Sequence, residues 1–385
     1  MQLDFHYYAT YCAAFLAGYS HEESLVICYS AQFVDCCTAS FLSDIKATKQ
    51  AATTQSQTEL LDVSPDIVSL QNVTRIWSSF HFLPGNLYAK KRFALKPYKD
   101  KYRLVCQPNG TLVADTVVLA KDKPLQSVGV AMHVLADTWA HRNFAGTPSM
   151  VINNTDTEFY EILPEGEVRK IKFRHNPAAA DDLEKSYYTN TVFSASETTI
   201  MNLGHGRAGH LPDYSFVRYK YMPAWDEYRE CLKDNPSEYY HAFCQMVYAM
   251  RFLRGDFDSF ELEHYDEDTV APYKEQIMDI ITRRQLDACA DWKAFGESLS
   301  GCVIPDFDDS AYVEEYKSSE ADVRYKTFLG KFIFAALDQK SMVTTKIFKS
   351  GNLLAGFSVD SNKRIASGMK EYLKLAEVKE KMFNE

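Results

Sequence analysis

The chain has 385 residues, of which 46% are hydrophobic and 24% are charged. This composition, with 24 Tyr and 24 Phe, supports a large folded core and excludes an intrinsically disordered protein. The formal net charge of −10 argues against a protein that wraps duplex nucleic acid, because such proteins need a basic face.

The first predicted elements are two helices. Residues 3–19 are predicted to form a helix, and the run Ser20-His-Glu-Glu23 is a capping box that starts the next one. On the second helix, Asp35 falls by helical spacing on the face that carries Leu25. A carboxylate on such a face requires a partner, so Asp35 is a candidate ligand.

The middle of the chain mixes predicted loops, strands and helices. Residues 47–58 are rich in Ala, Thr, Gln and Ser, which predicts a loop. Residues 86–125 carry β-branched runs on either side of Asn109-Gly110, which predicts a β-hairpin. A helix is expected from about Ser127 to about Phe144, and a short strand over 167–173.

The rest of the chain is predicted to be mostly helical. The expected breaks lie near Pro236, Gly255, Pro305 and Gly351. We therefore expect a mainly α fold with small β-hairpin insertions. Its domains would be a metal-binding α core over residues 1–215, with the β insertion near 86–125, and a helical C-terminal part over residues 216–385 that packs on the core.

The cysteines and the apolar runs predict the compartment. The nine cysteines form no CxxC pair, so neither a disulfide framework nor a cysteine-based zinc ribbon is expected. The N-terminus lacks the basic and apolar regions of a signal peptide. No apolar run approaches the roughly 20 residues that a membrane span needs. We expect a cytoplasmic setting and no membrane span.

The strongest chemical signal is the run His133-x-x-x-Asp137-x-x-x-His141. On a helix, these three side chains lie within about 80° of the circumference, and the two histidines lie about 12 Å apart along the axis. That separation is too large for one shared ion, but a central carboxylate between two histidines suits two neighbouring ions. The alternative is a set of hydrogen-bonded polar residues on a partly buried helix.

A second cluster lies in the glycine-rich segment that ends at Asp213. His205 and His210 precede this carboxylate, and glycines at 204, 206 and 209 would let the backbone approach an ion closely. Histidine with a carboxylate is an ordinary zinc ligand set. The alternative is a turn-rich surface loop with solvated histidines, and the spacing does not decide between His205 and His210 as the ligand.

Three further candidates carry weaker signals. His81 lies in the aromatic stretch Trp77–Pro84, where a lone histidine is more often a buried core residue than a ligand. Asp35 precedes two cysteines, which can be packing residues or soft ligands. His6 follows Asp4 by two residues and is modest evidence by itself.

Taken in order, these pieces resemble the superfamily of zinc-dependent phospholipases C and single-strand nucleases. That family has an all-α fold and three zinc ions. Its ligands are an N-terminal amine, a His five residues on, an Asp, a His before a Phe, a His-x-x-x-Asp helix, another His, and a closing His and acidic residue. The matching residues here are Met1, His6, Asp35, His81, His133, Asp137, His141, His205 or His210, and Asp213. The chain is also similar to an uncharacterised bacterial family that shares its Asp-Phe-His-Tyr-Tyr start and the stretch from His133 to Gly146.

The resemblance implies two or three zinc ions. One ion would be held by Asp35, His81, His133 and Asp137. A second would be held by His141, Asp213 and one or both of His205 and His210. A third would be held by His6, Asp137 and the amine and carbonyl of Met1, which the large residue Gln2 would protect from removal. Asp35 would also orient the attacking water.

The chain departs from the family pattern at two places. The family has five residues, including a Pro, between the Asp and the next His, whereas Asp137 and His141 are separated by three residues without a Pro. The family's closing pair stands four apart on a helix, whereas His210 and Asp213 are three apart after a glycine-rich loop. The resemblance covers the residues up to about 215.

The expected function is metal-dependent hydrolysis of a phosphoester by a metal-activated water. The substrate would be a small phosphorylated molecule or a phospholipid headgroup, since the negative net charge disfavours long polyanions. The alternative is a non-catalytic protein in which the metal cluster is structural. A hydrolase of the HD type, which is also all-α, is disfavoured because the chain contains no His-Asp dipeptide.

Overall fold

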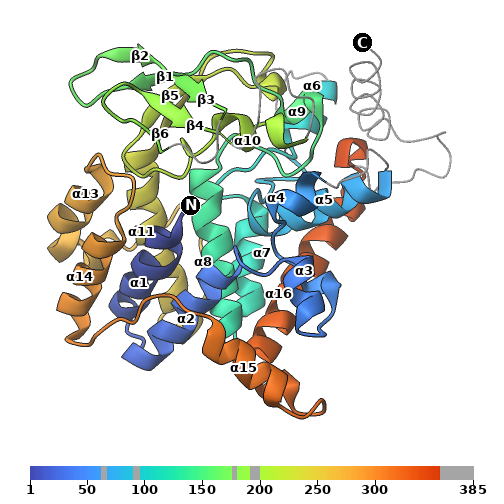
Figure 1. Ribbon diagram of the computed structural model, residues 1–385, viewed down its shortest axis with the longest axis vertical. Coiled ribbons are helices and arrows are strands. Elements are labelled where there is room, and N and C mark those ends of the chain that lie inside the picture. Colours follow the sequence, from blue (N-terminus) through green and yellow to red (C-terminus); the bar gives the residue numbers. More distant parts are fainter. Residues whose placement is uncertain (62–66, 90–95, 176–179, 191–199, 356–385) are drawn as a thin grey trace.

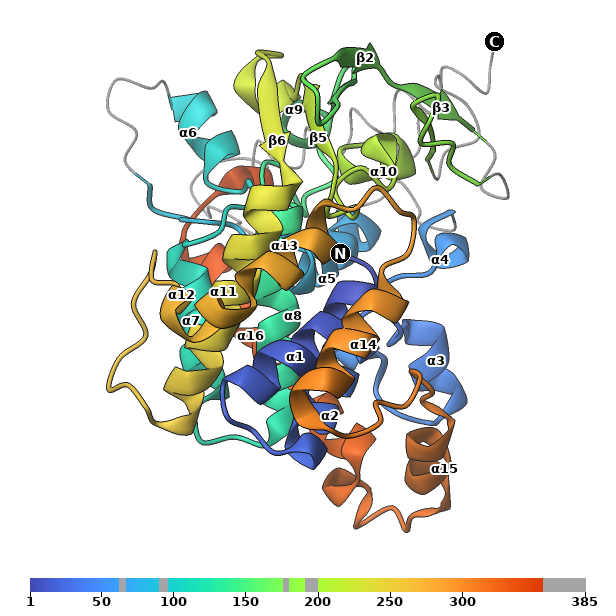
Figure 2. The ribbon, with the colours of Figure 1, turned by 90° about the vertical axis from the view of Figure 1, so that its left-hand side faces the viewer.

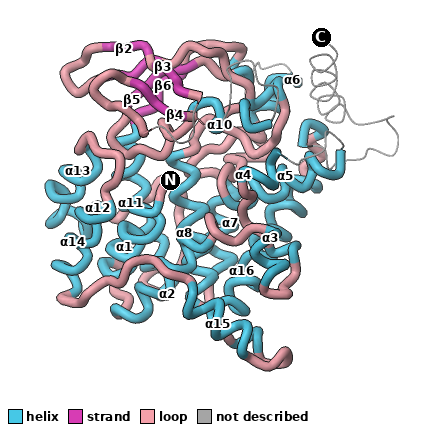
Figure 3. The backbone as a smooth tube through the Cα atoms, viewed as in Figure 1, coloured by secondary structure: helices cyan, strands magenta, loops and turns pink. Residues whose placement is uncertain are grey.

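The computed structural model describes residues 1–61, 67–89, 96–175, 180–190 and 200–355. Its body is helical, and a small layer of β-strands lies at one end (Figure 1, Figure 3). The predicted fold class, mainly α with small β insertions, is confirmed. No helix in the described ranges is both long enough and apolar enough to cross a membrane.

Helix α8 (Leu125–Ala140) runs through the middle of the helical body. Every residue from Val128 to His141 is buried, because other helices surround α8 on all sides. The helices that pack against it are α2 (His21–Phe33), α5 (Ile67–Phe80), α7 (Thr111–Ala120), α11 (Asn235–Arg254) and α16 (Phe328–Lys349). Polar side chains on α8 therefore need partners inside the protein.

The chain enters this body through a π-helix, η1 (Asp4–Ala9), which continues as α1 (Thr10–Leu16). The next helix, α2, begins with the predicted capping box: the Ser20 hydroxyl accepts from the Glu23 N–H, and the Glu23 carboxylate accepts from the Ser20 N–H. The chain begins at the junction between the helical body and the β layer (Figures 1 and 2).

The remaining helices cover the body or connect it to the β layer. They are α3 (Ala39–Asp44), α4 (Gln57–Leu61), α6 (Lys96–Tyr102), α9 (Met150–Asn153), α10 (His205–Ala208), α12 (Glu267–Val270), α13 (Lys274–Thr282), α14 (Cys289–Ser300) and α15 (Ser310–Ser318). Short 3-10 turns include η2 (Lys49–Ala51) and η3 (Ile200–Asn202).

The β layer consists of two small sheets. An antiparallel sheet has the order β2-β1-β5-β6, formed by β1 (Tyr160–Ile162), β2 (Val168–Lys170), β5 (Arg218–Tyr221) and β6 (Cys231–Asp234). A parallel pair joins β3 (Lys172–Arg174) to β4 (Tyr187–Thr189). The strand predicted over 167–173 corresponds to β2 and the start of β3.

The two parts predicted on either side of residue 215 are joined more closely than expected. Strands β5 and β6 lie in the region predicted to be mostly helical, and β5 pairs with β1 from the first part. Helices α11, α14 and α16 share one apolar core with the N-terminal helices. The later helices therefore share the core of the first part, and the sheet crosses the boundary at residue 215.

The hairpin predicted over 86–125 is wrong. The described residues there form α6 and α7, and residues 90–95 lie outside the described part. Asn109 has the left-handed φ of 58° that its turn requires, but Gly110 then caps the start of α7. Short apolar runs with β-branched residues fit either element, and here Val113 and Val117 are buried by helical packing.

The end of α8 also differs from the prediction. The helix stops at Ala140 instead of continuing to Phe144, and His141 is its C-terminal cap. Asn143 then adopts a left-handed φ of 76°, which turns the chain away from the helix axis. His141 still donates its backbone N–H to the Asp137 carbonyl oxygen at 2.8 Å, so it keeps the last helical position and the chain turns only after it.

Helix α8 approaches α2 most closely at Gly129. A Cβ atom there would lie 2.4 Å from the Ile27 carbonyl oxygen and 3.0 Å from the Ala31 nitrogen. We expect Gly129→Ala to lower the free energy of unfolding by about 1–3 kcal/mol, because the two backbones must separate. Chemical denaturation monitored by circular dichroism measures this change.

Ser127→Ala is the control, because it also yields alanine on α8, two residues earlier, but only removes a hydroxyl at a partly exposed position. We expect it to change the free energy of unfolding by no more than about 0.5 kcal/mol. Equal effects of the two substitutions would contradict a special close contact at Gly129.

Candidate metal centre

Nine of the ten residues expected to bind metal come together where η1, α2 and α8 meet the β layer. Met1 and His6 lie in the N-terminal segment, Asp35 follows α2, His81 follows α5, His133 and Asp137 lie on α8, His141 caps α8, His205 starts α10, and Asp213 lies in the loop after α10. These segments are distant in sequence, so only the fold brings the residues together.

Asp137 is the centre of this cluster, with 1% of its side chain exposed. Its Oδ1 lies 2.9 Å from the Met1 amine and 3.1 Å from Nε2 of His6. Its Oδ2 lies 3.1 Å from Nδ1 of His81 and 3.2 Å from Nε2 of His133. The two oxygens therefore face two different groups of nitrogen atoms, as a carboxylate shared between ions would.

Three of the imidazole rings are oriented by backbone carbonyl groups. His133 Nδ1 lies 2.9 Å from the Ala31 oxygen, His81 Nε2 lies 3.0 Å from the Thr53 oxygen, and His141 Nδ1 lies 2.7 Å from the His81 oxygen. A carbonyl oxygen only accepts, so each of these ring nitrogens donates its N–H. In the neutral ring, the other nitrogen then presents a lone pair to the cluster.

These lone pairs face carboxylate oxygens at short distances. His81 and His133 face Oδ2 of Asp137, and Nε2 of His141 lies 3.3 Å from Oδ1 of Asp213. Two acceptors at hydrogen-bonding distance repel each other unless a proton or a cation lies between them. Orienting a ring through the nitrogen that does not bind the ion is also the usual arrangement around protein-bound zinc.

The pKa values show which cluster groups stay unprotonated. Burial lowers the pKa of His6, His133 and His141 to about 4, so these rings are neutral at pH 7. Between pH 4 and 6.5 the unfolded chain binds protons that these folded rings do not, so their contribution to stability rises with pH across this window. Neutral imidazole is the form that binds metal.

The carboxylates and the amine remain charged. Burial alone would raise the pKa of Asp137 and Asp213, but nearby histidines and the Met1 amine hold both well below the usual range. Burial likewise opposes the charge on the amine, but Asp137 and Asp213 raise its pKa to about 11. The second oxygen contact of the amine is Asp213 Oδ1, at 3.2 Å.

The ligand atoms form three groups, each compact enough for one ion. The groups are His6, His133 and Asp137; Asp35, His81 and His133; and His141, His205 and Asp213. Within each group the candidate atoms lie within 4.8 Å of one another. The last group matches the expected second ion with His205 as its second histidine: Nε2 of His205 lies 3.2 Å from Asp213 Oδ1.

His210 does not join the cluster. Its Nδ1 lies 3.7 Å from Oδ2 of Asp181, and its side chain is 45% exposed. The nearby Asp181 carboxylate raises the pKa of His210 despite partial burial. The sequence could not distinguish His205 from His210 as the ligand, because Asp181, the partner of His210, belongs to a different segment.

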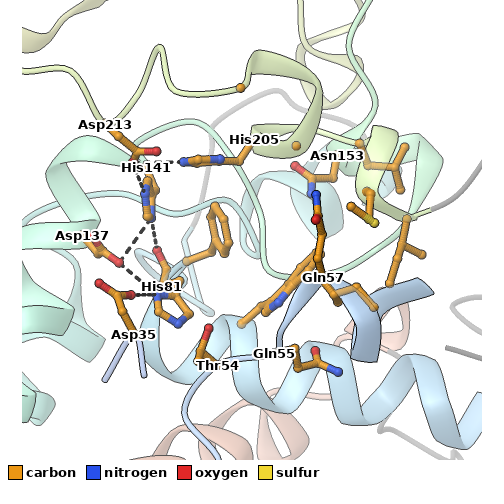
Figure 4. A pocket seen from close by; sticks show the side chains of 18 of the residues that line it. Asp35, Thr54, Gln55, Gln57, His81, Asp137, His141, Asn153, His205 and Asp213 are labelled. Carbon is orange, nitrogen blue, oxygen red and sulfur yellow. Dashed lines mark hydrogen bonds and ion pairs between the residues drawn. The ribbon is translucent and has the colours of Figure 1, made fainter. Parts of the chain in front are cut away.

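A cavity of about 370 Å³ opens onto the cluster. Figure 4 shows the acids and imidazoles on one side of it and Gln57 and Asn153 on the other. Apolar side chains complete the wall: Leu60, Trp77, Phe82, Ile200, Met201 and Leu203. Asp35 lies at the boundary between the cluster and the cavity, with 31% of its side chain exposed, and burial raises its pKa.

Lys340 on α16 was not predicted from the sequence, and it holds the loop that contacts His81. Its Nζ donates to the carbonyl oxygens of Gln50, at 2.7 Å, and of Ala52. The next residue, Thr53, orients His81 through its carbonyl and donates its hydroxyl to the Val34 oxygen, beside Asp35, at 2.6 Å. Burial lowers the pKa of Lys340 to about 8. No local sequence pattern distinguishes this lysine from others on α16.

Comparison with known proteins yields one match. A protein-family profile described as a family of unknown function (DUF6765) matches residues 1–348. No curated protein and no solved structure matches the chain significantly. The matched residues include every member of the cluster and Lys340.

An N-terminal Gly-Ser extension, left by a cleaved leader, tests the role of Met1. It converts the amine to an amide, which is a poor ligand and carries no charge. We expect the extended protein to hold about one metal ion fewer per chain, and its metal binding at pH 7 to release one proton fewer, because the free amine is protonated at that pH. Elemental analysis and calorimetry in two buffers measure these changes.

A Gly-Ser extension at the C-terminus is the control for added length and should change neither quantity. If the N-terminal extension also changes neither, Met1 is not a ligand.

Lys340→Met keeps the side-chain length but removes the donor to the loop that orients His81. We expect zinc affinity to fall by about tenfold or more, as for other residues that orient metal ligands. Competition with a chromophoric chelator measures the affinity, and the absorption spectrum of the cobalt-substituted protein reports the ligand geometry.

Lys346→Met on the same helix is the matched control, because Lys346 pairs with Asp115 at the protein surface. We expect it to leave both measurements unchanged. An unaltered cobalt spectrum in Lys340→Met would show that the loop keeps its position without the lysine.

Proposed function

The chain belongs to this family of unknown function, DUF6765, and we propose that it is a metal-dependent hydrolase of phosphoester bonds. Its cluster would hold two or three zinc ions. The observation that carries this proposal is the convergence of oriented imidazole lone pairs on the Asp137 and Asp213 carboxylates.

The chemistry of the ligands supports zinc. Imidazole nitrogen and carboxylate oxygen are ordinary zinc ligands, whereas magnesium and calcium prefer oxygen alone. The first ion would be held by Asp35, His81 and His133 with Oδ2 of Asp137. The second would be held by His141, His205 and Asp213. His6, Oδ1 of Asp137 and the Met1 amine would hold a third.

We further infer that the chain is a distant relative of the zinc-dependent phospholipases C and single-strand nucleases. The order of ligand residues supports this, and so does the position of His141. Although the spacing after Asp137 is short, Nε2 of His141 lies 3.3 Å from Oδ1 of Asp213. The closing pair is His205 and Asp213, which are eight residues apart instead of four.

When bound, zinc ions act as Lewis acids and lower the pKa of a bound water towards 7. The residues of the chain supply the remaining requirements. Asp35 is partly exposed to the cavity and can accept a hydrogen bond from the attacking water, which fixes the direction of attack. Burial of Asp137 among helices excludes bulk water from the opposite side of the cluster.

The cavity supports a small substrate with one phosphate and a neutral group. Its described lining contains no lysine or arginine, and none occurs in the sequence segments 62–66 and 191–199, which adjoin described residues of the lining in the chain. The metal ions would therefore supply the positive charge for the phosphate. The apolar wall and the amides of Gln55, Gln57 and Asn153 would receive the rest of the molecule, as in a small phosphodiester or a phospholipid headgroup.

Two further observations support parts of the proposal. Structural zinc sites are closed by protein ligands, whereas this cluster opens onto a cavity, so a catalytic role is favoured over a structural one. All nine cysteines are free thiols, which suits the proposed cytoplasmic location.

The central test uses the full chain, elemental analysis and a general phosphodiester substrate. We expect zinc in the purified protein and hydrolysis that a chelator abolishes and zinc restores. Asp137→Asn should lose most of the metal and the activity, because it removes the charge shared by the ions. Asp35→Asn should lower kcat by about 100-fold or more while retaining most of the metal, because other ligands remain.

Asp338→Asn is the matched control, because this carboxylate lies on the surface and pairs with Lys123. It should leave metal content and kcat unchanged. Bound zinc without hydrolysis of any phosphoester would refute the enzyme and leave the metal centre. A protein that binds no zinc would refute both.

A further inference from the structure

A second cavity, of about 180 Å³, lies between the β layer and the η3–α10 segment. It is separate from the candidate metal centre, although the same segment borders both. His205 and Met201 face the metal-centre cavity, whereas Arg207 and Asn202 face the second one. Nothing in the proposed hydrolysis uses this second cavity.

The cavity is divided into an apolar and a polar side. Phe159, Ile171 and Phe173 form the apolar side, and the two phenylalanine rings meet edge to face with centroids 5.3 Å apart. The polar side holds Arg207 and His175. A ligand that fits must therefore have an apolar body and a polar end.

Arg207 brings a positive charge that the described residues do not neutralise. Its Nε lies 3.4 Å from the Asn202 carbonyl oxygen, which fixes the guanidinium plane. In the described ranges no carboxylate lies within 4 Å of the guanidinium; the acid with the strongest influence on it is Asp156, which accepts the Glu158 N–H instead. Burial lowers the pKa of Arg207, but an arginine stays charged at any physiological pH.

Two neighbouring side chains are held in place beside this charge. The Asn190 amide donates to the Arg207 carbonyl oxygen at 3.3 Å, so its own oxygen faces Nδ1 of His175 at 3.0 Å. The other edge of the His175 ring is thereby directed away from Asn190. The backbone around Arg207 is also closely packed: a Cβ at Gly206 would lie 1.9 Å from the Met201 oxygen. The polar side is thus ordered without a ligand.

We propose that this cavity binds a small organic carboxylate, with the carboxylate on Arg207 and the apolar body against Phe159, Ile171 and Phe173. A guanidinium whose Nη groups have no partner among the described residues matches a planar carboxylate, and a charge-assisted pair of this kind is stronger than a neutral hydrogen bond. The aromatic wall selects an aryl or alkyl acid over a small inorganic anion.

The test is calorimetric titration of the full, metal-loaded chain with benzoate, and with benzamide as the neutral analogue of the same shape. We expect benzoate to bind and benzamide to bind at least about tenfold more weakly. Arg207→Met should weaken benzoate binding by about tenfold or more and leave the metal content unchanged. Arg169→Met is the matched control, because Arg169 pairs with Glu167 on the surface of the same layer, and it should bind benzoate like the unmodified protein.

Benzoate that binds Arg207→Met with unchanged affinity would overturn the proposal and assign the binding to the metal centre or another place. Equal binding of benzamide would overturn it as well. If Arg207→Met fails to fold, the Phe173→Trp variant tests the proposed site instead, because it narrows the cavity without changing a charge. That variant should lose benzoate binding, and unchanged binding would refute the site. These outcomes are independent of phosphoester hydrolysis.

Discussion

The carboxylate of Asp137 is buried on a helix that is itself buried, and the arrangement of the surrounding residues follows from this constraint. An unpaired charge in such a place is strongly destabilising. The fold brings a charged amine and several imidazoles to the two carboxylate oxygens, and these groups come from the N-terminal segment, the residues after α5 and α8 itself. The same groups form the proposed ligand set for metal ions, so the need to compensate the charge and the proposed chemistry have one structural origin.

The orientation of the histidines depends on backbone packing more than on side chains. Ala31, Thr53 and His81 contribute only carbonyl oxygens, and these oxygens decide which ring nitrogen faces the cluster. The contact to Ala31 exists because Gly129 lets α8 approach α2 closely. Gly129 therefore fixes the position of the His133 ring, although the glycine itself is not a candidate ligand. Such backbone contacts explain why the site is ordered although its ligands lie on separate elements.

Local sequence patterns predicted the local features of this structure. The capping box at Ser20 and the helix that carries His133 and Asp137 depend on residues a few positions apart, and both are observed. The hairpin around Asn109 was wrong because an Asn-Gly turn can start a helix as well as join two strands.

Long-range features were not accessible in the same way. The separation of His205 from His210 depends on Asp181, and the position of the His81 loop depends on Lys340, which lies 290 residues after Gln50. No periodicity or spacing in the sequence predicts contacts between residues so far apart in the chain. The order of candidate ligands along the chain, with the family resemblance, already grouped them into three sets, but the choice of His205 over His210 required the fold.

The bond from Lys340 to the loop at Gln50 also has a consequence for how the protein is made. During synthesis, the N-terminal candidate ligands leave the ribosome long before α16. The loop at Gln50 therefore lacks its hydrogen bond from Lys340 until most of the chain has been made. Contacts between such distant segments form late in folding, because a long loop must close first. The nascent chain thus carries exposed histidines and carboxylates that are not yet arranged around an ion. We therefore expect the proposed metal centre to be completed late in the maturation of the protein, and a product truncated before α16 to lack the contact that holds the loop at Gln50.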